Sequence, residues 1–176
     1  MKFLTLTFLL FITNSILSQT FTYTFYGVIT NHDTKTHEKN VLISFVVKDK
    51  TIDSLYTSKD GSYKMTKPFT MGDTIYIVLS KIGFVSKKIE LITSIPSSEE
   101  ILDISKPCLN LSGDIFAERP GIDFSFLNTE PVAIMKWDES TDDYILDMIA
   151  YKIVKAKIET LLNPTTESTP SSTTTK

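Results

Sequence analysis

The sequence predicts a mainly β protein, a sandwich of about seven strands followed by one C-terminal α-helix. Between residues 20 and 93, short segments alternate apolar and polar residues at roughly 8 to 12 residue spacing, which is typical of an antiparallel sandwich. Turn-forming residues separate these segments. Residues 141–162 instead repeat apolar residues at helical spacing, which predicts the helix.

The individual strands follow from the alternation. In the first strand, Phe21, Tyr23 and Phe25 fall on one face, and threonines fall on the other. Residues 41–47 (VLISFVV) are apolar on nearly both faces, which predicts a central strand. The same reasoning predicts further strands at residues 52–58, 61–66, 73–80 and 86–93.

The stretch TSKDGSYKM, residues 57–65, contains an acidic residue beside a glycine. A calcium loop needs several acidic or amide ligands at alternate positions and a distal glutamate, whereas this stretch offers Asp60 between Lys59 and Lys64. Asp60-Gly61 between two alternating segments predicts a β-hairpin instead, because Gly61 can take a positive φ.

Residues 96–162 form an extension after the predicted sandwich of residues 20–95. Short apolar pieces broken by prolines and glycines predict one or two edge strands before the helix. Ser140 and Asp143 resemble a capping box at the start of the helix, which we expect at residues 141–162. The helix has two apolar stripes. They consist of Leu146, Ile149, Ile153 and Ala156, and of Val154, Ile158 and Leu161. One stripe could pack on the sandwich, and the other either contacts a partner or is covered by residues 114–137.

Both termini differ in composition from the rest of the chain. Lys2, the apolar run from Phe3 to Ile12 and the small polar residues up to Ser18 predict a secretory signal peptide at residues 1–18, with a cut after Ser18 or Ser15. The apolar run is too short for a membrane span. Residues 163–176 (NPTTESTPSSTTTK) cannot bury an apolar face, which predicts a disordered tail.

The sequence offers few reactive groups. The 18 basic and 21 acidic residues give a net charge of −3, which argues against nucleic-acid binding. Cys108 is the single cysteine, so no internal disulfide forms, and we expect it either in the core or paired with another chain. No motif for a serine nucleophile or a phosphate loop is present.

Four candidate metal ligands, His32, Asp33, His37 and Glu38, share one polar loop. They could clamp a metal, but a solvated turn is the simpler interpretation. The acidic pairs Glu99-Glu100 and Asp142-Asp143 are explained by solvation in a loop and by helix capping.

Two further groups could take part in binding. The lysines Lys81, Lys87 and Lys88 form a small basic cluster that we interpret as a solvated turn. Trp137 could stack on a sugar or fasten the helix to the sheet. Phe21, Tyr23, Phe25, Phe45 and Tyr76 occupy strand positions that predict a place in the core.

An ordered set of motifs carries a resemblance to a known family. Gly27-Val28-Ile29 ends the first strand, the apolar strand 41–47 follows, and SKDGSY (58–63) precedes SKIGFVSKKIEL (80–91) with its Gly83-Phe84-Val85. Over about residues 21–93 this set resembles the carboxypeptidase-regulatory-like domain, in the form found in small exported envelope proteins of Bacteroidota. The polar insert 31–40 departs from the shorter turn of many members.

The resemblance implies a transthyretin-like (prealbumin-type) sandwich and an accessory, non-catalytic role. We therefore expect a non-enzymatic exported module, a structural or protein-interaction component of the bacterial cell envelope with an envelope protein as partner. We expect no catalytic, cofactor or metal site and no membrane span in the mature chain. We expect the mature chain in the periplasm, at the outer membrane or outside the cell. The alternative is a carbohydrate-binding module, which the sandwich and the aromatic residues suggest.

Overall fold

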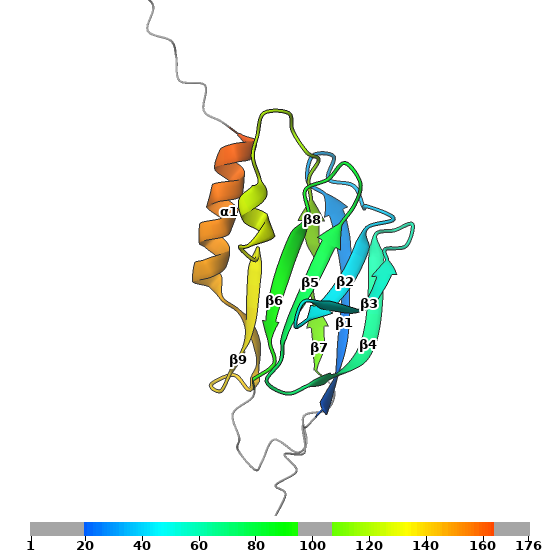
Figure 1. Ribbon diagram of the computed structural model, residues 1–176, viewed down its shortest axis with the longest axis vertical. Coiled ribbons are helices and arrows are strands. Elements are labelled where there is room, and N and C mark those ends of the chain that lie inside the picture. The colour runs from blue at the N-terminus through cyan, green and yellow to red at the C-terminus, as the bar shows by residue number, and fades with distance from the viewer. Residues whose placement is uncertain (1–19, 95–106, 164–176) are drawn as a thin grey trace, which may run out of the picture.

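The computed structural model of the chain describes residues 20–94 and 107–163. It contains two β-sheets that face each other, with one helix along an edge of the sandwich (Figure 1). This arrangement confirms the predicted mainly β sandwich with a C-terminal helix. The expected signal peptide, the Glu99-Glu100 pair and the tail from residue 164 lie outside the described residues.

The first sheet is built around the long strand β1 (Thr20–Asn31). It pairs antiparallel with β4 (Ser62–Thr70) and parallel with two three-residue strands, β7 (Cys108–Asn110) and β8 (Gly113–Ile115). The predicted alternation of β1 is observed, since Tyr23, Phe25 and Ile29 are fully buried. Segments from both sides of residue 95 therefore pair with this strand.

The second sheet has the strand order β10-β9-β6-β5-β2-β3. Its strands are β2 (Leu42–Val47), β3 (Lys50–Tyr56), β5 (Thr74–Ser80), β6 (Lys87–Ile92), β9 (Ala133–Asp138) and β10 (Asp143–Leu146). All neighbours are antiparallel except β6 and β9. β2 lies between two neighbours, as its apolar sequence predicted.

The extension after residue 95 contributes more to the sheets than the sequence predicted. Its described residues, 107–163, supply four strands, β7 to β10, where one or two edge strands were expected. β7 and β8 are too short to show an alternating pattern, and both pair in parallel with the distant β1. Strands from both sides of residue 95 thus share the same two sheets.

The helix starts later than predicted. α1 spans Met148–Leu162, and residues 143–146 form β10 instead of the first helical turn. Asp147 is the N-cap, since its Oδ1 accepts hydrogen bonds of 3.1 Å from the backbone N–H groups of Ile149 and Ala150. The expected capping box is absent because Ser140 donates to Asp138 instead. Burial of Tyr144 against the core stabilises the strand.

The predicted hairpin at Asp60-Gly61 is wrong. The turn connects β3 to β4, which belong to different sheets, and β3 instead forms its hairpin with β2 through Lys48 and Asp49. Both of these residues have positive φ, which such two-residue turns require. The expected positive φ of Gly61 is confirmed at 72°. Asp60 accepts hydrogen bonds from the hydroxyl groups of Ser58 and Ser62.

We predict that Gly61→Ala lowers the free energy of unfolding by about 2 kcal/mol or more. A Cβ at this position would lie 2.5 Å from the backbone oxygen of Ile29, and φ is positive. Gly72→Ala is the matched control, because φ is +84° there and nothing lies within 4 Å. Urea unfolding of both variants measures the difference. Equal stability of the two variants would show that the close approach to β1 is unimportant.

The main core lies between the sheets and is rich in aromatic rings. Phe25 packs against Phe45 and Phe69 at centroid distances of 5.0 and 5.7 Å. The hydroxyl groups of Tyr23 and Tyr144 are 2.8 Å apart and join the two sheets. The predicted core positions Tyr23, Phe25 and Phe45 are confirmed, whereas Phe21 and Tyr76 are half-buried.

Cys108 is not a core residue. Alternation in β7 places Leu109 inward at 5% exposure and turns Cys108 outward, where its thiol is exposed. A lone cysteine is often buried, but here the strand's register with β1 decides its side.

Candidate functional site

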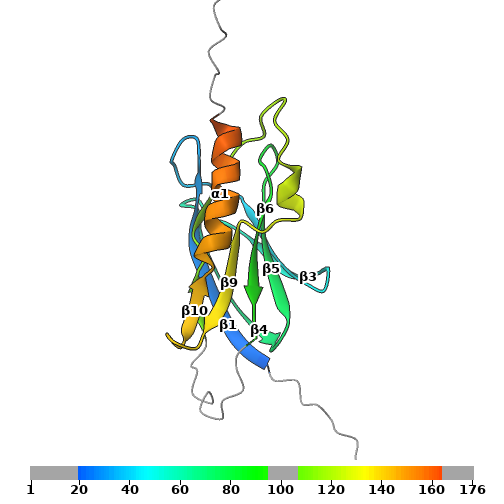
Figure 2. The same ribbon diagram turned by 90° about the vertical axis from the view of Figure 1, so that its left-hand side faces the viewer.

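Figure 2 shows α1 along the edge of the sandwich. A cleft of about 760 Å³ lies between this helix and the sheets. The end of β1 and the following loop form one wall, and α1 forms the opposite wall with Tyr151, Lys155 and Glu159. Apolar side chains of the sheet and the helix, among them Leu79, Ile89 and Ile158, line its interior. The cleft has the size of ordinary small-molecule sites.

Three charged or titratable side chains meet in this cleft. The Lys87 Nζ, from the start of β6, donates to Asp114 Oδ1 at 2.6 Å and to the Asp114 backbone oxygen at 2.9 Å. The other carboxylate oxygen of Asp114 lies 2.7 Å from Nδ1 of His32. Asp114, in β8, thus bridges a buried lysine and a histidine that follows β1.

Burial and ion pairing act on this bridge in opposite directions. Burial opposes ionisation of the Asp114 carboxyl, but the charge and hydrogen bond of Lys87 and the hydrogen bond of His32 together hold the pKa of Asp114 below its usual value. Burial lowers the pKa of Lys87, while Asp114 counteracts this effect. The Lys87 side chain is 7% exposed, so the carboxylate is its required counter-ion.

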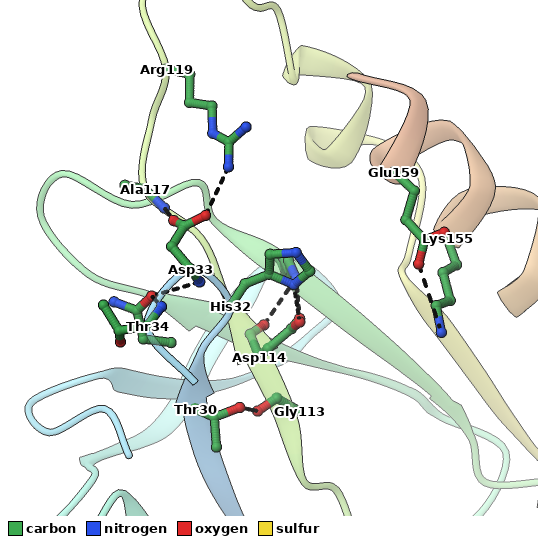
Figure 3. A network of polar contacts seen from close by, with 12 residues as sticks. Thr30, His32, Asp33, Thr34, Gly113, Asp114, Ala117, Arg119, Lys155 and Glu159 are labelled. Atoms are coloured by element: carbon green, nitrogen blue, oxygen red, sulfur yellow. Dashed lines mark hydrogen bonds and ion pairs between the residues drawn. The ribbon is translucent and has the colours of Figure 1, made fainter. Parts of the chain in front are cut away.

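Phe116 contacts both the Lys87 ammonium and the His32 ring. The Lys87 ammonium lies 4.5 Å from the centroid of the Phe116 ring, and the His32 ring meets the same phenyl edge-on at 6.3 Å. Figure 3 shows His32 beside Asp114, with Lys155 and Glu159 of α1 standing opposite. Lys155 and Glu159 are 3.9 Å apart and half-exposed. The cleft therefore has a rigid side on the sheets and a looser side on the helix.

The four candidate metal ligands of the loop do not converge. His32 binds Asp114, Asp33 pairs with Arg119 at 2.7 Å, and Glu38 pairs with Lys81 and Asn31. Among the described residues, no group of three or more His, Cys, Asp or Glu side chains could hold a metal ion. Residues 33–37 of the loop, His37 among them, are exposed, as expected for a solvated turn. Ion pairs of His32, Asp33 and Glu38 also hold the loop.

The predicted lysine cluster is wrong. Lys81 pairs with Glu38, Lys88 donates to the Asn128 backbone oxygen at 3.0 Å, and Lys87 points into the protein. The sequence contained a signal for this, since Lys87 is in phase with the inward residues Ile89 and Leu91 of the same strand. Asp142 lies in the β9–β10 turn and Asp143 is the first residue of β10, so this acidic pair is not at a helix start.

The hydrogen bond to Asp114 orients the imidazole ring of His32. A catalytic use of such a pair needs a nucleophile within hydrogen-bond reach of the ring. Within residues 20–94 and 107–163, no serine, threonine or cysteine side chain bonds to His32.

A second candidate surface is the face of α1 that carries Ile149 and Ile153, opposite the residues that hold the helix on the protein. Val154, Ile158 and Leu162 are buried on Phe116, Phe124 and Leu127, the last of which lies in the short helix η2 (Ser125–Asn128). Residues 114–137 thus cover the second predicted stripe. Ile149 and Ile153 remain 77% and 64% exposed, so the described residues leave the first stripe uncovered. Leu146 is not part of it, because it lies in β10.

Trp137 lies in β9 and packs edge-on against Tyr144 at 5.3 Å. Its side chain is half-buried against the main core. Stacking on a sugar would instead need an exposed ring face. The exposed aromatic residues are elsewhere, at a hollow of about 580 Å³ lined by Tyr26 and Tyr56.

Comparison with known proteins gives distant structural similarity. No family model matches the chain, and a search of curated proteins found no match. A 3-chlorocatechol 1,2-dioxygenase from Rhodococcus opacus 1CP is similar with a TM-score of 0.40 at 10% identity, over 58% of this chain and 62% of that one. The group B streptococcus pilus 2b backbone protein gives 0.35 at 13% identity, over 54% and 41%. A streptococcal ancillary pilin gives 0.34 at 14%, over 58% and 30%.

The matched regions span less than two thirds of each of these three chains. In the part of the chain that the structure describes, no helix has the length and apolar character for a membrane crossing.

Proposed function

We propose that this chain is a non-enzymatic, exported β-sandwich module that serves as a structural or protein-interaction component of the bacterial cell envelope. The observation that carries the proposal is the uncovered apolar stripe of α1. We call it the outer stripe, and it consists of Ile149, Ile153 and Ala156. Isoleucines on an outward helical face add nothing to the core and are suited to contact with another protein.

The outer stripe is separate from the residues that hold the helix in place. Val154, Ile158 and Leu162 already anchor α1, so the fold does not need Ile149 or Ile153. Burying each isoleucine against a partner would contribute about 1.5 to 3 kcal/mol. Lys152 is exposed beside the stripe, so a partner with an apolar groove edged by carboxylates fits best.

The other parts of the proposal rest on the sequence. The predicted signal peptide at residues 1–18 supports export and a place in the periplasm, at the outer membrane or outside the cell. The motifs of residues 21–93 support the carboxypeptidase-regulatory-like, transthyretin-type module, whose role is accessory. The observed sandwich is consistent with this module, and residues 96–162 supply the helix that carries the outer stripe.

The proposal is tested by crosslinking in the cells that produce the chain, with wild type and the double variant Ile149→Lys/Ile153→Lys. Lysine has a good helix propensity and the sites are exposed, so we expect the variant to unfold within a few degrees of wild type. We expect one envelope protein to be crosslinked to wild type and lost from the variant.

Ile52→Lys is the matched control, since Ile52 is an exposed isoleucine of the edge strand β3. It should keep the partner. A partner that survives in the double variant, or no partner at all, would contradict docking through α1.

Carbohydrate binding stays a second candidate because of the hollow at Tyr26 and Tyr56. Tyr56 is 65% exposed, and Asn110 in the same lining could bond to sugar hydroxyls. Trp137 lies in β9, and three strands separate β9 from β3, which carries Tyr56. The fluorescence of Trp137 is therefore a poor reporter for this site. A glycan array with wild type and Tyr56→Ala tests it, and binding lost in the variant would favour this function.

A further inference from the structure

We propose that the cleft between α1 and the sheets is a binding site for a small amphipathic carboxylate, a singly charged organic acid with an apolar body. This site is independent of the outer stripe, because it lies on the inner side of α1 and uses Lys155 and Tyr151. The proposal rests on the charge balance of the cleft and on its apolar interior.

The charge balance favours one negative charge. Three lysines (Lys35, Lys87 and Lys155) and two carboxylates (Asp114 and Glu159) line the cleft, which leaves a net charge of +1 with the histidines neutral. Both carboxylates already have a cationic neighbour, at 2.6 Å for Asp114 and 3.9 Å for Glu159. The whole chain is acidic at −3, so this local excess of positive charge is a property of the cleft.

The interior of the cleft favours an apolar body. Leu79, Ile89 and Ile158 contribute to the lining, and Val132 and Ala133 add further apolar atoms at the start of β9. An inorganic anion would leave these groups facing water, whereas a hydrocarbon or aromatic chain would cover them. The volume of about 760 Å³ accommodates such a molecule.

Lys35 and Lys155 are suited to hold the carboxylate head, since both are ammonium donors in the lining of the cleft. Asp114 accepts a hydrogen bond of 2.7 Å from Nδ1 of His32, so Nε2 of the neutral ring is an acceptor and does not bind the carboxylate. Phe116 and the buried Lys87 keep this arrangement in place. Lys155 approaches from the opposite wall on a half-exposed side chain (Figure 3). The head would therefore be bound between a lysine of the loop that follows β1 and a lysine of the helix.

Octanoate is the probe, and its titration into the full chain is followed by amide NMR shifts. We expect saturable shifts at His32, Asp114 and Ala133, which lie around the cleft. Octan-1-ol has the chain without the charge, and acetate has the charge without the chain. Each should bind at least about tenfold more weakly than octanoate.

Two helix variants identify the site. Lys155→Glu should weaken octanoate binding at least about tenfold, because it reverses a charge in the cleft. Lys152→Glu makes the same change on the same helix outside the lining, and it should stay within about twofold of wild type. Circular dichroism confirms that both variants fold.

Four results would overturn the proposal. They are the absence of saturable octanoate binding, equal binding of octan-1-ol, equal binding of acetate, and an equal effect of the two helix variants. None of them bears on the outer stripe, and loss of the crosslinked partner in the Ile149→Lys/Ile153→Lys variant does not bear on the cleft.

Discussion

Replacing Asp114 with alanine should lower the free energy of unfolding by about 3 kcal/mol, because it leaves the Lys87 ammonium buried without its counter-ion. The Lys87 side chain is 7% exposed, and Asp114 supplies both of its hydrogen-bond acceptors. The substitution removes the carboxylate and keeps the backbone acceptor. Asp114 is 39% exposed, so water screens part of the interaction, which places the expected value at the lower end for buried pairs.

The reciprocal variant separates an unpaired charge from a lost contact. Lys87→Met keeps the apolar stem over Phe116 and removes the ammonium, so the double variant Asp114→Ala/Lys87→Met should be more stable than Asp114→Ala alone. Urea unfolding of the four proteins completes the cycle. A double variant as unstable as the sum of the singles would mean that the two side chains do not interact.

The same pair predicts a dependence on pH. The pKa of Asp114 is lower in the folded chain than its ordinary value of 3.8. The folded state then favours the ionised carboxylate, and its contribution is fully present above the unfolded pKa and is lost as pH falls through the folded pKa. Compared with Asp114→Asn, wild type should lose its stability advantage below about pH 4. A constant difference between the two curves down to pH 2 would contradict this.

Replacing Phe25 with alanine should lower the free energy of unfolding by about 3 to 5 kcal/mol. Phe25 has no exposed surface, and its ring packs between the sheets against Phe45, Phe69 and Tyr23. Those rings belong to three different strands, so none can shift to fill the cavity without disturbing its own pairing.

Tyr26→Ala is the matched control on the same strand. Tyr26 is the next residue, points to the opposite face and is 38% exposed, so its loss should cost about 1 kcal/mol. Thermal and urea unfolding measure both variants. Similar losses for Phe25→Ala and Tyr26→Ala would mean that the core does not lie where the alternation of β1 places it.

The sequence predicted the strands up to residue 93 because each carries its own alternating pattern. β1, β2, β5 and β6 were found near their observed bounds, since each strand turns one regular apolar face to the core. Partner choice was harder to predict. Asp60-Gly61 has the composition of a hairpin, and only long-range pairing of β4 with β1 makes it a link between sheets.

The region after residue 95 shows where local patterns fail. The local sequence of residues 143–146 is compatible with both a strand and a helix. These residues form a strand because they pair with β9. The cleft depends on contacts between distant segments, since His32, Lys87 and Asp114 come from three separate places in the chain. The inward phase of Lys87 was the one local sign of this site.

The most direct measurement of the central claim, that α1 docks onto an envelope protein, is site-specific photocrosslinking in the producing cells. A photoreactive residue at Ile153 should crosslink to one envelope protein, because this side chain is 64% exposed in the outer stripe. The same residue at Ile52, exposed on the distant edge strand β3, should not crosslink to that protein. An absence of crosslinks from Ile153, or the same products from both positions, would contradict docking through the outer stripe.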